Sequence, residues 1–157
     1  MRPTTRAAVL VVLGDPLRLV DLEIPELRLG QVLVDIAWSG VCRAQILEAR
    51  GGKGHDRFLP HAMGHEGAGV VRAVGEGVTK VRPGDPVVLS WIKGIGADAG
   101  GSVYGSEIGP VNGGAVTTFM RTTIASENRV TPIPPEMPLR EAALLGCAIP
   151  TGAGMVL

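Results

Sequence analysis

The chain has 157 residues and a formal net charge of zero, with 15 basic and 15 acidic side chains. This length fits one domain that buries its own core. The balanced charge, without a basic patch, argues against nucleic acid or an anionic membrane as a partner. No segment reaches the roughly 20 apolar residues that span a bilayer, and a cytoplasmic location is the default expectation.

Short β-strands are predicted along most of the chain, because 23 glycines and 12 prolines punctuate its apolar runs. The first run, residues 7–13, is followed by a Gly-Asp-Pro turn rather than the cleavage site of a signal peptide. It is therefore predicted to pair with residues 17–24 in a hairpin. Further strands are expected at residues 31–37, 67–74, 85–90, 116–123 and 128–133.

Two short helices are predicted, at residues 41–49 and 138–145. Gly51 and Gly52 end the first, and Gly146 is the expected C-terminal cap of the second, so that Cys147 follows a sharp stop. Residues 94–114 contain eight glycines and few core-forming side chains. This segment is predicted to be a long surface loop.

Three candidate metal ligands, Cys42, His65 and Cys147, stand in the glycine-flanked stretches GVCR, GHEGAG and GCAIPTGAG. Two thiolates and one imidazole, with the fourth position left to water, are typical of a catalytic zinc site. Alone, each residue would more often be a buried core side chain, and the two cysteines could instead form one disulfide. His55 and His61 fall in a polar loop, where they are expected to be solvated and offer no obvious fourth ligand.

These stretches, in this order and with VGEGV and PGD between them, resemble the catalytic domain of zinc-dependent medium-chain alcohol dehydrogenases over residues 6–157. The resemblance implies a mainly β fold, a GroES-like, partly open β-barrel with a few short helices. Residues 6–143 would form the barrel, and residues 144–157 would begin the connection to a nucleotide-binding domain. No dinucleotide-binding fingerprint with a following βαβ unit occurs in the chain, so this Rossmann domain is expected to be missing.

The resemblance also implies roles for individual residues. One catalytic Zn²⁺ would be held by Cys42, His65 and Cys147, with Glu66 lying behind the metal. Trp91 would line the substrate pocket and Arg43 would contact a cofactor phosphate, although a core tryptophan and a plain surface arginine are the ordinary alternatives. The complete enzyme would transfer a hydride between a small alcohol or aldehyde and NAD(P), and this part alone is expected to be inactive.

The chain departs from the family pattern after Cys42. The family's hydroxyl residue, which starts a proton relay, is replaced by Ala44, and its relay histidine by Leu47. Gln45 stands where an aspartate usually supports the histidine ligand, and its amide oxygen could accept the imidazole N–H. The four-cysteine lobe that binds a structural zinc in many members is absent, because no cysteine lies between Cys42 and Cys147.

Two other classes of function remain open on the sequence. One is a zinc-free reductase-type barrel, and the other is a stand-alone oligomeric binding module. The segment at residues 144–157 is apolar and carries no charge. If it is exposed, self-association is expected, with a homodimer as the simplest closed form.

Overall fold

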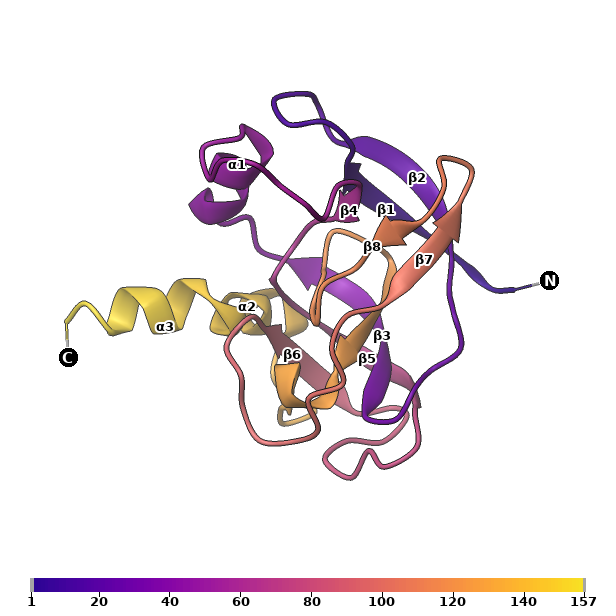
Figure 1. Cartoon of the computed structure of the whole chain (residues 1–157). Coiled ribbons are helices and arrows are strands. Elements are labelled where there is room, and N and C mark those ends of the chain that lie inside the picture. Colours follow the sequence, from indigo (N-terminus) through magenta and orange to yellow (C-terminus); the bar gives the residue numbers. More distant parts are fainter. Residues whose placement is uncertain (1, 157) are drawn as a thin grey trace.

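The computed structural model describes residues 2–156 and is built from two β-layers (Figure 1). The strands of the first layer close into a barrel in the order β1 (Thr4–Leu10), β2 (Arg18–Glu23), β7 (Val103–Ser106), β8 (Val111–Asn112) and β4 (His61–Ala62). The second layer is a five-stranded sheet in the order β10 (Val130–Pro132), β6 (Pro86–Ser90), β5 (Glu66–Val74), β3 (Gln31–Ser39) and β9 (Thr122–Ser126). The predicted mainly β barrel is confirmed.

The predicted hairpin at the N-terminus is confirmed. β1 and β2 pair antiparallel from Thr4 opposite Glu23 to Val9 opposite Arg18. Alternate side chains of both strands point into the barrel, so that Val9 and Leu22 are fully buried. Alternation of this kind is the pattern that the pleat of a half-buried strand requires.

The interpretation of residues 94–114 as one long surface loop was wrong. This segment contributes β7 and β8 to the barrel, and Tyr104 is completely buried in the barrel core. The Tyr104 hydroxyl accepts the backbone N–H of Ile124 at 2.9 Å, which satisfies its polar atom inside the core. Tyr104 and Val111, both completely buried, therefore anchor this glycine-rich segment in the barrel core.

The long central strand β3 organises the second layer, because it pairs with β5 on one side and with β9 on the other. Val32 and Val34 on β3 pack with Val71, Val87 and Leu89 in a separate apolar cluster. The predicted strand at residues 116–123 is displaced in the structure, where β9 begins at Thr122. The residues before β9 form an irregular link, since the Phe119 N–H donates to Met63 and the Phe119 carbonyl accepts from Ala8.

The helices are short. α1 (Arg43–Ala49) lies where the sequence predicts it. Gly51 follows its C-terminal end with a φ of 76°, which is readily adopted only by glycine. Near the C-terminus, α2 (Leu139–Ala142) continues as a 3₁₀ turn, η2 (Ala143–Gly146). After Cys147 a third helix follows, α3 (Ala148–Ala153), which the sequence did not predict.

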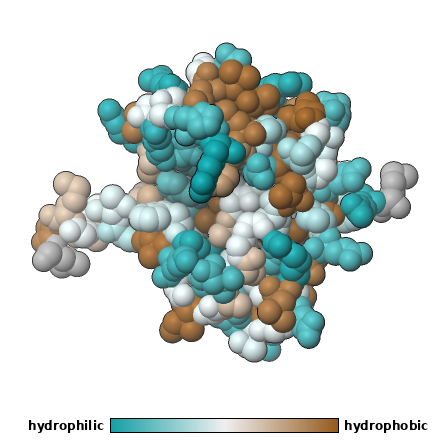
Figure 2. All heavy atoms as spheres, viewed as in Figure 1, coloured by the Kyte–Doolittle hydropathy of each residue, from teal (hydrophilic) through white to brown (hydrophobic). Residues whose placement is uncertain are grey.

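α3 projects from the body of the protein, at the left in Figure 1. Its exposed side chains include Ile149, and Met155 and Val156 follow it at 86% exposure. Figure 2 shows that this projecting segment carries no strongly hydrophilic side chain. Self-association through this surface stays a prediction.

No described helix is long and apolar enough to cross a bilayer. Within residues 2–156 the only parallel strand pair is β4 beside β8, so this range contains no parallel sheet of βαβ units.

The loop that precedes β7 is fastened by Glu127, which lies in a 3₁₀ turn, η1 (Glu127–Arg129), and is 2% exposed. Its carboxylate accepts backbone N–H groups of Thr79, Lys80 and Ala97 at 2.7–2.8 Å. Burial raises the pKa of Glu127, but these three N–H groups and the Lys80 charge outweigh it and hold the pKa below its ordinary value.

Glu127→Gln is expected to lower the free energy of unfolding by about 2 kcal/mol at pH 7, since hydrogen bonds to the carboxylate charge are lost. A carboxylate with a depressed folded pKa stabilises fully above its unfolded pKa and loses this effect as the pH falls through the folded value. The difference in the free energy of unfolding between the unmodified protein and Glu127→Gln should therefore shrink below about pH 4. Urea unfolding at pH 7 and pH 3.5 measures it, with the exposed Glu136→Gln as control. Equal stability of both variants at pH 7 would contradict this role.

Candidate metal centre

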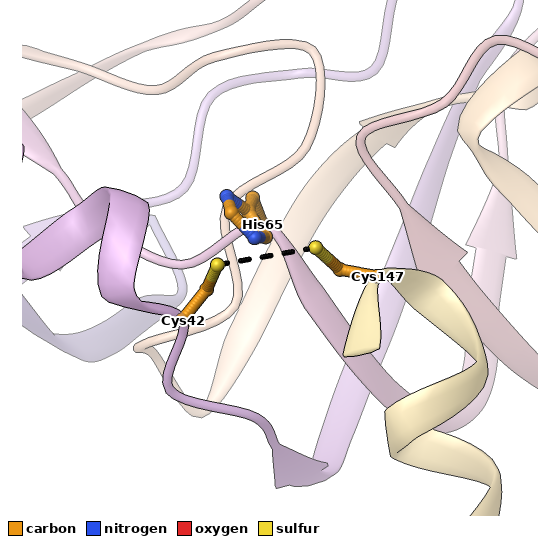
Figure 3. Close-up of side chains that lie close together, drawn as sticks. All are labelled: Cys42, His65 and Cys147. Carbon is orange, nitrogen blue, oxygen red and sulfur yellow. Dashed lines mark hydrogen bonds between the residues drawn. The ribbon is translucent and has the colours of Figure 1, made fainter. Parts of the chain in front are cut away.

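Three side chains from distant parts of the chain converge at one end of the second layer (Figure 3). Cys42 caps the start of α1, His65 immediately precedes β5, and Cys147 lies at the break between η2 and α3. One sulfur or ring nitrogen from each residue lies within 4.8 Å of the others. The structure therefore brings together all three ligands that the sequence predicts.

The spacing of these atoms fits a tetrahedral zinc ion. The Cys42 and Cys147 Sγ atoms are 4.0 Å apart and both thiols are free, so they do not form the disulfide considered from the sequence. Two sulfurs at the usual zinc–sulfur distance would be separated by about 3.8 Å. His65 Nε2 is buried and has no hydrogen-bond partner among the described residues. Since buried polar atoms are normally satisfied, a bound metal ion would account for this atom.

The local backbone explains why glycine precedes the histidine. Gly64 has a φ of 105°, and a Cβ there would come within 2.6 Å of the Thr118 backbone nitrogen. A larger residue would push apart the chain segments that position His65. The glycine of the GHE stretch is therefore required by this crossing of segments.

Burial sets the ionisation of the ligands. It lowers the pKa of His65, with Glu66 opposing the shift, so the imidazole is favoured in the neutral form that binds metals. Burial raises the pKa of the Cys147 thiol, and the neighbouring Cys42 raises it further, while Thr151 and the nearby Trp91 act in the other direction. A bound metal cation would instead lower the pKa of the thiol, because a thiol that coordinates a metal is deprotonated.

Glu66 follows His65 in the chain and is 1% exposed. Its Oε2 accepts the Ala148 N–H at 3.0 Å and so ties β5 to the residue after Cys147. Gly40 and Gly146 make room for it, because a Cβ at either position would come within 2.8 Å of Glu66 side-chain atoms. The carboxylate thus holds two ligand-bearing segments together.

Gln45 was expected to support the imidazole of His65, but in the structure it contacts Cys42 instead. Gln45 is buried, and its Oε1 accepts the Cys42 backbone N–H at 3.3 Å. No hydrogen bond joins Gln45 to His65 within residues 2–156, so the expected contact with the imidazole is absent there. Ala44 offers no hydroxyl, and Leu47 is half exposed.

A cavity of about 770 Å³ has His65 in its wall, whereas Cys42 and Cys147 do not line it. Phe58, Met63 and Val116 provide apolar surface, and Gln45 lines the end nearest α1. The cavity suits a ligand with an apolar body, since binding sites combine such walls with a few polar groups.

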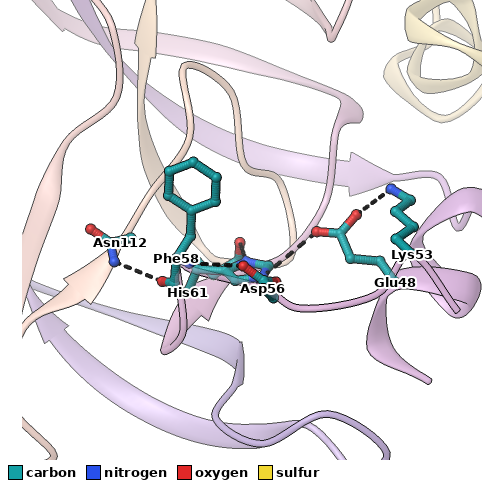
Figure 4. A network of polar contacts seen from close by, with 7 residues as sticks. Glu48, Lys53, Asp56, Phe58, His61 and Asn112 are labelled. Atoms are coloured by element: carbon teal, nitrogen blue, oxygen red, sulfur yellow. Dashed lines mark hydrogen bonds and ion pairs between the residues drawn. The ribbon is translucent and has the colours of Figure 1, made fainter. Parts of the chain in front are cut away.

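His61 contradicts the expectation that it is solvated, because it lies in β4 and is only 9% exposed (Figure 4). Its Nε2 is 2.9 Å from Asp56 and 3.6 Å from Glu48, and Lys53 pairs with Glu48. His55 is exposed as predicted. Sequence reasoning missed this polar network on the cavity wall, because only the folded loop brings its members together.

The two other residues singled out from the sequence lie outside the cavity wall. Trp91 follows β6 and is half exposed, close to the Cys147 sulfur. Arg43 begins α1 and is exposed. Neither placement assigns a role.

Comparison with known proteins identifies the fold and the family. The family model for the alcohol dehydrogenase GroES-like domain matches residues 28–135. Similar proteins include the class-3 alcohol dehydrogenase of Pisum sativum, 33% identical over 98% of this chain, and the NDMA-dependent alcohol dehydrogenase of Amycolatopsis methanolica, 34% identical over 94%. The chain spans 47% and 46% of these relatives, respectively.

Solved structures agree with the sequence comparison. The alcohol dehydrogenase zinc-binding domain protein from Burkholderia ambifaria superposes with a TM-score of 0.86 and 31% identity, covering 98% of this chain and 48% of that one. Benzyl alcohol dehydrogenase from Acinetobacter calcoaceticus gives a TM-score of 0.79 at 26% identity, covering 97% and 47%. The resemblance inferred from the sequence is confirmed, and the chain belongs to the family of alcohol dehydrogenase GroES-like domains.

Proposed function

We propose that this chain is the zinc-binding catalytic part of an alcohol or aldehyde oxidoreductase, with one zinc ion held by Cys42, His65 and Cys147. The observation that carries the proposal is the convergence of two free thiols and a His65 ring nitrogen within 4.8 Å of one another, with His65 at the wall of a large cavity. The buried, unpartnered Nε2 of His65 supports it. Three protein ligands leave one position open, as catalytic zinc sites do. The four-ligand shell of a structural site is not completed by any other described cysteine or histidine.

The protein's own groups would divide the work around this centre. Zinc, when bound, supplies Lewis-acid polarisation of a substrate oxygen. The apolar wall formed by Phe58, Met63 and Val116 would bind the carbon skeleton of a small alcohol or aldehyde. Glu66 and Gln45 would fix the backbone on either side of the ligands, and this positioning is the protein's contribution to such sites.

The proposed overall reaction is hydride transfer between the substrate and NAD(P). We assign the barrel to residues 6–143, and residues 144–157 to the start of a connection toward a nucleotide-binding domain. This assignment is supported by the relatives, of which the chain covers about half. In the same proposal Trp91 contacts substrate near Cys147, and Arg43 contacts a cofactor phosphate.

A zinc-free reductase-type barrel is the main competing function. The convergence of two thiols and an imidazole favours zinc, since a metal-free barrel would have no use for this set. A stand-alone binding module is disfavoured by the same argument.

Substitution with Co²⁺ tests the open position, because cobalt bound by two thiolates gives visible bands that respond to a change in its fourth ligand. We expect these bands to shift saturably with benzyl alcohol and with imidazole. Toluene, which has the ring of benzyl alcohol without its oxygen, should leave the bands unchanged. A spectrum unaffected by imidazole and benzyl alcohol would indicate a closed structural site and contradict the proposed function.

A further inference from the structure

We infer that a second cavity, between β6, β10 and η2, binds a small phosphate-type oxyanion through the guanidinium of Arg129. The cavity has a volume of about 280 Å³. None of the three proposed zinc ligands lines it, so this site does not depend on the proposed function. Its lining includes residues of β6, β10 and η2, and Figure 1 shows β6 close to α2.

Arg129 differs from every other arginine in the described chain. The other arginines are all exposed, whereas Arg129 is partly buried at the end of η1. Its Nε atom is fully buried and has no hydrogen-bond partner. Within residues 2–156 its guanidinium forms neither a hydrogen bond nor an ion pair.

The unpaired N–H donors of Arg129 favour an anionic ligand. The guanidinium stays charged at all relevant pH values and has five N–H donors. A buried N–H donor without a partner is costly, and other arginines of the same chain do find carboxylates, as Arg6 does with Asp21 and Arg72 with Asp35. The Arg129 charge acts on the exposed Asp98 carboxylate, but the two form no ion pair, because Asp98 is paired with Lys93. The unused donors of Arg129 therefore point to a ligand that the protein alone does not provide.

The remaining lining of the cavity suits an oxyanion. Lys93 lines it and adds a second positive charge, while its Nζ is held by Asp98 at 2.7 Å. Thr131 adds a hydroxyl group. No aspartate or glutamate lines the cavity. A tetrahedral oxyanion presents several acceptor oxygens to donors from different directions, which fits a lining that supplies a guanidinium, an ammonium and a hydroxyl group.

Phosphate is the ligand chemistry that these groups favour, and it can come from free phosphate or from a phosphomonoester. Titration of ¹⁵N-labelled protein with sodium phosphate, followed through the arginine Nε–H resonances, tests the site directly. Sodium chloride at matched ionic strength is the salt control, because exposed charges respond to screening alone. We expect one saturable shift, of the Arg129 Nε–H, with phosphate and none with chloride.

The variants make the assignment specific. Arg129→Gln should weaken phosphate binding at least about tenfold, the effect of losing hydrogen bonds to a charged group. Lys93→Gln, which retains Arg129, should weaken it about threefold, the scale of one exposed charge pair. Arg18→Gln removes an exposed arginine without a partner and should leave binding unchanged.

A parallel titration with glycerol 3-phosphate identifies the source. Tighter binding than phosphate indicates a phosphomonoester ligand, and equal or weaker binding indicates free phosphate; both results support the site. Absence of a saturable Arg129 shift in the unmodified protein would overturn the inference. Should Arg129→Gln fail to fold, equal phosphate affinity of Lys93→Gln and Arg18→Gln would overturn it as well.

Discussion

His65→Ala is expected to lower the zinc affinity of the chain by more than about 100-fold. Loss of a residue that merely supports a ligand typically costs 10- to 100-fold in metal affinity, and here a ligand itself is removed. The two cysteine sulfurs would remain, 4.0 Å apart, but a site with two protein ligands should release its metal readily to a chelator. Competition with a chromophoric chelator measures the affinity.

His55→Ala is the matched control for this variant, because His55 is an exposed histidine of the same chain. Its zinc affinity should equal that of the unmodified protein. His61→Ala removes a buried side chain and should affect stability more than zinc binding, since His61 is bonded to Asp56. Equal zinc retention in the three variants would contradict the assignment of His65 as a ligand.

Gly146→Ala is expected to reduce both stability and zinc binding. A Cβ at residue 146 would collide with the Leu89 carbonyl oxygen and lie 2.8 Å from the Glu66 Cβ. Forcing an extra methyl group into a packed site costs about 1–3 kcal/mol. Because Cys147 is the next residue, any backbone shift that relieves the collision also displaces a proposed ligand.

Gly152→Ala provides the comparison, since a Cβ on Gly152 in α3 would have no atom within 4 Å. Alanine favours helix over glycine by about 1 kcal/mol, so this variant should be as stable as the parent or slightly more so. Urea unfolding and chelator competition on both variants give the two quantities. If Gly146→Ala and Gly152→Ala had the same free energy of unfolding and the same zinc affinity, neither property would depend on the close packing of η2 against β6 and Glu66.

The sequence predicted those parts of the site whose signal lies in a local pattern. Cys42, His65 and Cys147 stand in glycine-flanked stretches because segments cross closely there, as at Gly64. The β1–β2 hairpin and α1 were likewise predicted from local turn residues, and the structure confirms both.

Other features depend on contacts between distant segments and left no local signal. Tyr104 is drawn into the core although glycines surround it, and its hydroxyl is bonded to Ile124. His61 is buried because the folded loop brings Asp56 and Glu48 to it. α3 was missed because its six residues include Gly152 and Pro150, although a helix tolerates proline in its first turn.

Zinc content is the most direct measure of the central claim. Elemental analysis of the chain, purified without added metal, should give about one zinc per chain, and thiol reagents should reach Cys42 and Cys147 only after chelation. The three converging ligands within 4.8 Å of one another are the basis of this expectation. A zinc content near zero, with both thiols reacting freely, would contradict it. A content near two would mean that a further group, such as Glu48, Asp56 and His61, also binds metal.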